Sequence, residues 1–340
     1  MSTVASTKPA GAPRRRIREP MTTAHKLDIV GRYGVVVPFL IILIVCAIFV
    51  PHFLSPNNIS NMLVNASTFA VIGVGMTIVI ALRGLDLSVG SVEGLATCIA
   101  AIVTLAAGPI WGVLCGLAVG LGIGLINGVL VSVFRVPAFV ATLGTKGVLL
   151  GVSLILTQGQ VVQVPDSAGL GTFADIALGP FPLPFLFALG VLLLGYLLVD
   201  HTPFGRHLIA VGGNPEAARD SGIHVRRVTL IAYVIAGLCA AIGGLMLLSQ
   251  IGTASGTLGQ GVELQVIAIA VLGGSSLTGG TANLVGTGIA ALLLSFVYSA
   301  LNLINVPSYF QYLAVGIILL FALGTDSLRR YFQQRALIGE

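Results

Sequence analysis

The feature that most constrains this chain is a series of long apolar runs without basic residues. No Lys or Arg occurs at 147–205 or at 228–328. A helix needs about 20 apolar residues to cross a bilayer, and several runs approach or exceed that length. Only 9% of the residues are charged, whereas a soluble domain has about 25%. Because so few charges cannot cover a water-facing surface, we predict an all-α protein that crosses the membrane many times.

The apolar runs predict about ten membrane-spanning helices. Together they form one transmembrane domain at 33–328, with a basic, disordered tail at 1–32 and a second tail at 329–340. The expected spans are 33–50, 62–82, 88–107, 110–134, 138–158, 183–200, 228–250, 262–274, 280–300 and 308–325.

Basic residues predict the orientation, because cytoplasmic loops of membrane proteins are enriched in Lys and Arg. Outside the two tails they occur at Arg83, Arg135 and Lys146 and in the loop at 202–227. With about ten spans, most of these cations and both termini fall on the cytoplasmic side. The segments 159–182 and 251–261 are then expected on the opposite side.

The polar stretch at 202–227 contains a short helix with both ends marked. Asn214 can cap it, Pro215 suits its first position, and Glu216 places negative charge at the positive end of its dipole. Gly222 can adopt the left-handed turn that ends it. Helices shorter than about 12 residues are marginal in water, so the rest of the loop or another protein must hold this one. It is either a solvated connector or a docking helix for a cytoplasmic partner.

Glycines recur every four residues in one predicted span. This spacing places them on one face of a helix, where a second helix can approach closely. The spacing therefore predicts tight helix packing. The glycines are Gly108, Gly112, Gly116, Gly120, Gly124 and Gly128. The cysteines have no paired spacing and are interpreted as small buried hydrophobes. They are Cys46, Cys98, Cys115 and Cys239.

Two glycine-rich breaks, at 83–91 and 272–280, place polar groups at or near membrane depth. Irregular backbone at that depth needs protein or a water-filled cavity to satisfy it. Carboxylates are costly there, so Asp86, Glu93 and Glu263 are functional candidates. Two alternatives stay open. Asp86 could cap the following helix and pair with Arg83, and Glu263 could lie in water at the outer interface.

Neutral amides in or beside the spans suit a neutral polyhydroxylated solute, although each could equally join two helices. They are Asn65, Asn127, Gln158, Gln250, Gln265, Asn302, Asn305 and Gln311. Combined with the polar break, they predict a substrate pathway that includes Asn65, Asp86, Ser88, Glu93, Asn127, Gln265 and Asn302.

Sequence signatures of catalysis are absent. Neither glycine-rich break has the Gly-Lys-Ser/Thr ending of a phosphate loop, and no HExxH or GxSxG motif occurs. We predict no catalytic residue, no metal ligand and no bound cofactor, so any ATP and Mg must be used by a separate ATPase. The basic residues lie in loops and tails without an aromatic patch, which argues against a nucleic-acid partner.

Four longer motifs occur in a fixed order. They are GLDLSVGS at 84–91, VPAFVATLGT at 136–145, GNPEAARDSGI at 213–223 and VLGGSSLTGG at 271–280, with FGR at 204–206 and Asn302-Leu303 as shorter matches. With these motifs, the chain resembles the membrane permease subunits of bacterial ABC importers for monosaccharides of the ribose, xylose, arabinose and galactose type.

This resemblance implies a ten-helix fold like that of the vitamin B12 importer, in the bacterial inner membrane and surrounded by lipid. It implies a homo- or heterodimer of permeases, a cytoplasmic ABC ATPase and a periplasmic or lipid-anchored sugar-binding protein. It also implies that the 202–227 loop couples to the ATPase through Gly213, Asn214, Glu216, Ala217, Ala218, Arg219 and Gly222. The alternatives are a proton-coupled secondary transporter, with Asp86, Glu93 or Glu263 as its relay, and a membrane scaffold.

Overall fold

A computed structural model describes residues 35–307 and, beyond them, 309–311, 313–314, 316–318, 320 and 324. The predicted tails at 1–32 and 329–340 lie outside these residues. Within them, seven helices are long and apolar enough to cross a membrane, so the chain is a multi-pass membrane protein. These helices are α3 (Pro56–Ala81), α4 (Val89–Ala107), α5 (Pro109–Ser132), α6 (Ala138–Thr157), α8 (Leu183–His201), α11 (Val225–Ile251) and α13 (Leu284–Leu303).

The other three predicted spans contain shorter apolar helices. These are α2 (Val36–Phe49), α12 (Val262–Leu272) and Tyr309–Ile318, the last of which includes residues outside the described part. The 11 residues of α12 extend about 16 Å, roughly half of a 30 Å hydrocarbon core. Every predicted run therefore contains a helix, but α12 is too short to cross the membrane alone.

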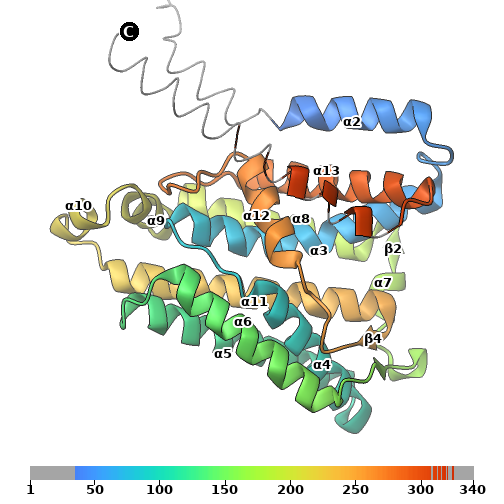
Figure 1. Cartoon of the computed structure of the whole chain (residues 1–340), viewed down its shortest axis with the longest axis horizontal. Helices are drawn as coiled ribbons and strands as arrows, with labels where there is room; N and C mark the ends of the chain where they lie inside the picture. The colour runs from blue at the N-terminus through green and yellow to red at the C-terminus, as the bar shows by residue number, and fades with distance from the viewer. Residues whose placement is uncertain are drawn as a thin grey trace, which may run out of the picture.

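The long helices lie side by side, and the connecting elements gather at their two ends (Figure 1). At one end, on the left of the view, lie α9 (Pro203–Gly213) and α10 (Pro215–Asp220). We call this the arginine end, because Arg83, Arg135 and Arg219 lie there. The opposite end holds η1 (Asp166–Ala168), α7 (Thr172–Asp175), β1 (Val162–Gln163), β2 (Ala177–Leu178), β3 (Phe181–Pro182) and β4 (Thr253–Ala254).

The short strands join connections that are far apart in sequence. β1 pairs antiparallel with β4, placing Val162 opposite Ala254, and β2 pairs with β3 in a hairpin. The predicted outer segments 159–182 and 251–261 therefore meet at one end of the molecule. The second segment also turns back along α4, since a side chain at Gly94 would meet the Leu258 carbonyl oxygen at 2.4 Å.

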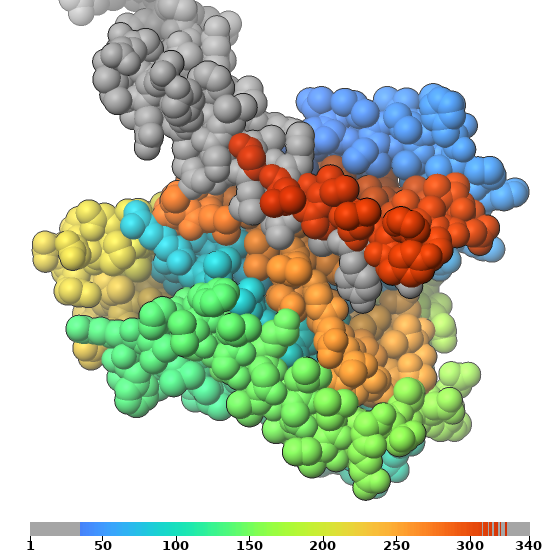
Figure 2. Space-filling model, in the orientation of Figure 1, coloured from blue at the N-terminus to red at the C-terminus, as the bar shows by residue number. Residues whose placement is uncertain are grey.

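Helix α3 forms the centre of the structure. Its residues from Ala70 to Ala81 are buried, and it packs against α8, α11, α12 and α13. Outer helices α5, α6 and α8 instead expose large apolar side chains, such as Leu121, Val148 and Leu194. In the space-filling view, α6 covers the lower face and α2 and α13 the upper face (Figure 2). This inside-to-outside distribution is expected where lipid replaces water as the surrounding solvent.

The glycine face of α5 packs as predicted, with one exception. A Cβ at Gly120 would lie 2.4 Å from the Gly237 carbonyl oxygen of α11, and one at Gly112 would lie 2.0 Å from Thr104 Oγ1 of α4. Gly108 does not belong to this face, because it precedes α5 with φ +96° and nothing lies within 4 Å of an added Cβ. All four cysteines are free; three are buried and Cys115 is half-buried.

Candidate functional site

The short helix predicted in the 202–227 loop is present as α10. The Asn214 side chain accepts hydrogen bonds from the backbone N–H groups of Glu216 (3.0 Å) and Ala217 (3.1 Å). Gly222 ends the helical turn with φ +83°. Glu216 and Arg219 are exposed to solvent, and Ala218 is buried against the molecule. The capping prediction is therefore confirmed, and α10 presents charged side chains at the end of the bundle.

What holds α10 is a second helix that the sequence did not reveal. α9 precedes it directly and buries Leu208 and Val211 in the same apolar cluster as Ala218. Thr202 caps α9 by accepting from the Gly205 N–H at 3.4 Å. We expected one short helix in a polar loop, and the loop instead contains a pair of helices anchored in the core.

The C-terminal end of α9 meets two other segments at one point. We call this contact of Ala81, Gly212 and Gly280 the three-way junction. The Gly280 N–H donates to the Ala81 carbonyl at 2.9 Å, and a Cβ at Gly212 would lie 1.8 Å from that same oxygen. Arg83 adds a hydrogen bond to the Gly213 carbonyl. The end of α3, the end of α9 and the break before α13 are thereby held together beside α10.

The first polar break forms a buried hydrogen-bond chain between helices. The Ser88 hydroxyl donates to Asp86 Oδ1 at 2.6 Å and accepts from Asn127 Nδ2 at 2.8 Å. Asn127 Oδ1 in turn accepts from the Thr145 hydroxyl at 2.7 Å. Three of the predicted pathway residues therefore lie together, and they connect the start of α4 to α5 and α6.

The structure decides one alternative that the sequence left open for Asp86. Arg83 bonds to Gly213, and no Asp86–Arg83 ion pair occurs among the described residues. The Asp86 carboxylate instead accepts from both the backbone N–H and the hydroxyl of Ser88, directly before α4. The ion pair with Arg83 is therefore excluded, because the Arg83 side chain is used at the three-way junction.

An ion pair between a half-buried lysine and a buried glutamate joins α6 to α12. Lys146 Nζ bonds to Glu263 Oε1, and the Glu263 side chain is 5% exposed. Lys146 lies about 12 Å along α6 from Ala138, well inside the span predicted at 138–158. Because Glu263 is buried against this helix, the alternative that it lies in water at the outer interface is excluded. An ionisable pair at this depth marks a functional site by default.

Glu93 completes this charged group. A Cβ at Gly90 would lie 2.8 Å from Glu263 Oε2, and one at Gly259 would lie 3.2 Å from Glu93 Oε2. The two carboxylates therefore flank the contact between Gly90 and Gly259. Neither Glu93 Oε2 nor Glu263 Oε2 has a hydrogen-bond partner in the described part of the chain. The Lys146–Glu263 ion pair and the nearby Glu93 carboxylate thus form one charged group, in which each carboxylate keeps one acceptor oxygen without a partner among the described residues.

Three predicted pathway residues remain, and two of them lie elsewhere. Asn65 is exposed on α3 and accepts from Gln250 of α11 at 3.2 Å. Asn302 is exposed near the end of α13 and accepts from Gln311 at 2.6 Å. Gln265 is half-buried on α12, and its Oε1 has no partner among the residues described. Asn65 and Asn302 therefore connect helices and do not join the central polar group.

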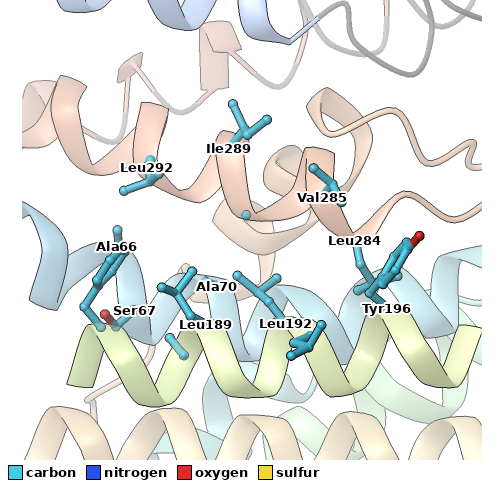
Figure 3. Close-up of a pocket in the computed structure, with 14 residues that line it drawn as sticks. Ala66, Ser67, Ala70, Leu189, Leu192, Tyr196, Leu284, Val285, Ile289 and Leu292 are labelled. Atoms are coloured by element: carbon cyan, nitrogen blue, oxygen red, sulfur yellow. The ribbon is translucent and has the colours of Figure 1, made fainter. Parts of the chain in front are cut away.

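An apolar cavity of about 310 Å³ lies between α3, α8 and α13. Its labelled lining consists of aliphatic side chains with two hydroxyls, Ser67 and Tyr196 (Figure 3). The Ser67 hydroxyl already donates to the Leu63 carbonyl at 2.6 Å. Because a polyhydroxylated solute needs many hydrogen-bond partners, this cavity is unsuitable for it.

Sequence reasoning missed three polar residues. Lys146 could have been found as the one charged residue inside the run predicted at 138–158. Thr142 and Thr145 belong to the 136–145 motif, but nothing in the motif shows that they face Leu87 and Asn127. The Thr142 Oγ1 accepts from the Leu87 N–H at 3.1 Å, a contact that only the fold brings about.

Comparison with known proteins now decides the class of this site. Residues 58–323 match the family described as the permease component of the branched-chain amino acid transport system. The chain belongs to this permease family. No solved structure matches it.

Curated relatives of this permease cover most of its length. The ribose import permease protein RbsC of Escherichia coli K12 is 36% identical over 298 residues, covering 86% of this chain and 93% of the relative. RbsC of Bacillus subtilis is 37% identical over 309 residues, covering 89% of this chain and 94% of the relative. The L-arabinose ABC transporter permease protein AraH of Azospirillum brasilense is 35% identical over 315 residues, with 91% of both chains covered. The predicted resemblance to permease subunits, which are not themselves enzymes, is confirmed.

Proposed function

We propose that this permease forms the membrane pathway for a monosaccharide, or a similar polyhydroxylated solute, in an ATP-driven importer. The central observation is the set of unpartnered acceptors at Glu93 Oε2, Glu263 Oε2 and Gln265 Oε1. A buried acceptor without a partner is costly, and the hydroxyls of a sugar are donors that can satisfy it. The printed names of the relatives, which refer to ribose and L-arabinose, support the same solute class.

The family description also names branched-chain amino acids, and charge distinguishes the two substrates. A zwitterionic amino acid needs an anionic and a cationic partner. In this permease Lys146 already pairs with Glu263, and none of the neighbouring residues of the group (Asp86, Ser88, Glu93, Asn127, Thr145 and Gln265) offers a cation for the carboxylate of an amino acid. This arrangement favours a neutral solute. The proton-coupled alternative is not retained, because the relatives include a permease of an ABC transporter.

The proposed assembly lies in the bacterial inner membrane and has three further components. A second permease, identical or not, completes the pathway, and a periplasmic or lipid-anchored binding protein delivers the sugar. A cytoplasmic ABC ATPase uses ATP and Mg and docks on α10, where Glu216 is exposed and does not line a described cavity. In this assembly the permease has about ten membrane helices, arranged as in the vitamin B12 importer, and both of its termini lie on the ATPase side. The permease itself binds no cofactor or metal.

Uptake into proteoliposomes tests this function. The permease is reconstituted with its ATPase and binding protein, and accumulation of labelled ribose, L-arabinose and leucine is compared with and without internal ATP. We expect ATP-dependent accumulation of a monosaccharide, and its loss in Glu216→Lys while the protein still inserts. Accumulation of leucine alone would contradict the proposed substrate. Uptake without the ATPase would contradict the transport class.

A pair of variants tests the polar group itself. Glu93→Leu removes an acceptor and should lower uptake about tenfold, as one lost hydrogen bond is worth about 1–3 kcal/mol. Glu93→Gln keeps an acceptor oxygen and should retain most of the uptake. Asn302→Leu serves as a control, because that side chain pairs with Gln311 away from the group. Equal uptake by Glu93→Leu and Asn302→Leu would remove Glu93 from the pathway.

A further inference from the structure

A second cavity, of about 1080 Å³, opens at the arginine end of the molecule. It lies between the α5–α6 turn, α10 and the start of α11. None of the described acidic residues lines it, since Glu216 and Asp220 of α10 lie outside its lining. Its basic lining residues are Arg83, Arg135, Arg219, Arg226, Arg227 and His224. We call it the basic cavity.

The five arginines of the basic cavity have no acidic partner in the described part of the permease, where none of them forms an ion pair. Arg83 bonds to the Gly213 carbonyl, while Arg135, Arg226 and Arg227 are exposed. Arginine is the side chain best suited to bind phosphate, through several donors in a fixed planar geometry.

Two hydroxyl groups at the floor of the basic cavity also lack partners. Tyr233 is 1% exposed and Ser132 is 8% exposed, and both line the cavity. Neither hydroxyl oxygen has a hydrogen-bond partner among the described residues. The Tyr233 hydroxyl lies against Gly84, where an added Cβ would approach it to 2.8 Å. Buried hydroxyls normally have partners, so these two independently indicate that the cavity receives a polar ligand.

Apolar side chains surround Arg135 on the same turn. Val133, Phe134, Phe139 and Val140 are all about half exposed or more, with Phe134 at 70%. They continue into the exposed apolar face of α6, which includes Leu143 and Val148. A ligand seated among the arginines therefore has an apolar surface beside it that leads into the membrane.

We propose that the basic cavity binds the phosphate headgroup of an anionic phospholipid, with its acyl chains lying along α5 and α6. Basic pockets between transmembrane helices near the membrane surface are suited to such headgroups. A soluble anion would have no use for the apolar surface, and a zwitterionic lipid would bring no net negative charge to the arginines. The proposal does not depend on the transported solute. It places a lipid in contact with Arg219 and Pro215 of α10, so lipid composition would influence the helix through which the ATPase is proposed to act.

Native mass spectrometry of the purified full-length permease in detergent tests this site. Phosphatidylglycerol and phosphatidylcholine with identical acyl chains are titrated separately, and glycerol 3-phosphate serves as a headgroup without chains. We expect phosphatidylglycerol to bind at least tenfold more tightly than either of the others. Equal binding of the two lipids would overturn the proposal. Equal binding of glycerol 3-phosphate would make the cavity a site for soluble anions and would also overturn it.

Substitutions locate the binding. Arg135→Gln and Arg226→Gln should each weaken phosphatidylglycerol binding about fivefold, the effect expected of one basic residue near an anionic surface. Arg135→Lys keeps the charge and should retain most of the affinity, which separates lost charge from misfolding. Arg206→Gln is the matched control, because Arg206 is exposed on α9 outside the cavity. If the glutamine variants keep their lipid selectivity but no longer co-purify with the ATPase, the cavity is a protein-docking surface and the lipid assignment is wrong.

Discussion

Replacing Gly120 by alanine tests how closely α5 and α11 must approach. The added Cβ would lie 2.4 Å from the Gly237 carbonyl oxygen and 2.5 Å from the Ala241 Cβ, about 1 Å closer than ordinary contact at 3.4 Å. Both obstacles belong to the partner helix, one of them to its backbone, so no side chain can rotate away. Overpacking of this kind typically costs about 1–3 kcal/mol, and we expect Gly120→Ala to lower thermal stability accordingly.

Gly122 on the same helix supplies the control. Nothing lies within 4 Å of a Cβ added there, and alanine favours a helix over glycine by up to about 1 kcal/mol. The midpoint of thermal unfolding in detergent, followed by size-exclusion chromatography of the heated protein, should therefore fall for Gly120→Ala and stay level or rise for Gly122→Ala. Equal midpoints for the two variants would refute the inference that α5 and α11 are in backbone contact.

Three further substitutions test the polar groups. Lys146→Met should destabilise the permease by about 3–5 kcal/mol, because it leaves Glu263 buried without a counter-charge. Adding Glu263→Gln should restore most of the lost stability. A double variant as unstable as Lys146→Met alone would contradict the ion pair. Asn127→Leu removes the hydrogen bonds that the amide makes with Ser88 and Thr145, each worth about 0.5–1.5 kcal/mol, so thermal stability should fall by about 1–3 kcal/mol. An unchanged midpoint would show that water replaces the amide. Asn214→Ala should cost α10 about 1 kcal/mol and lower ATP-dependent uptake without lowering the amount of inserted protein; unchanged uptake would show that the cap is dispensable for coupling.

The sequence predicted those features that depend on local chemistry. Asn214, Pro215 and Gly222 mark the ends of α10 by rules that involve only a few neighbouring residues, and the structure confirms them. The four-residue spacing of the glycines similarly identified the face of α5 that packs against α4 and α11. In both cases the physical cause lies within one helix, so one sequence is sufficient.

Features that depend on contacts between distant segments could not be predicted in this way. Glu263 and Lys146 are 117 positions apart, so the sequence left open whether Glu263 is functional or exposed to water. It also allowed Arg83 to pair with Asp86, three residues along the chain, while the fold gives Arg83 the Gly213 carbonyl instead. Helix α9 was missed because its sequence is part of the polar stretch that we interpreted as a loop. Only the fold shows that its Leu208 and Val211 are buried in the core.

The three-way junction has a mechanical consequence. Since Gly212 has no room for even a methyl group against Ala81 and Gly280, α9 cannot slide along its neighbours without moving them. A displacement of α10 would therefore be transmitted at the three-way junction to two elements, the central helix α3 and the segment that leads into α13. Both sides of the α3–α13 contact would then move together.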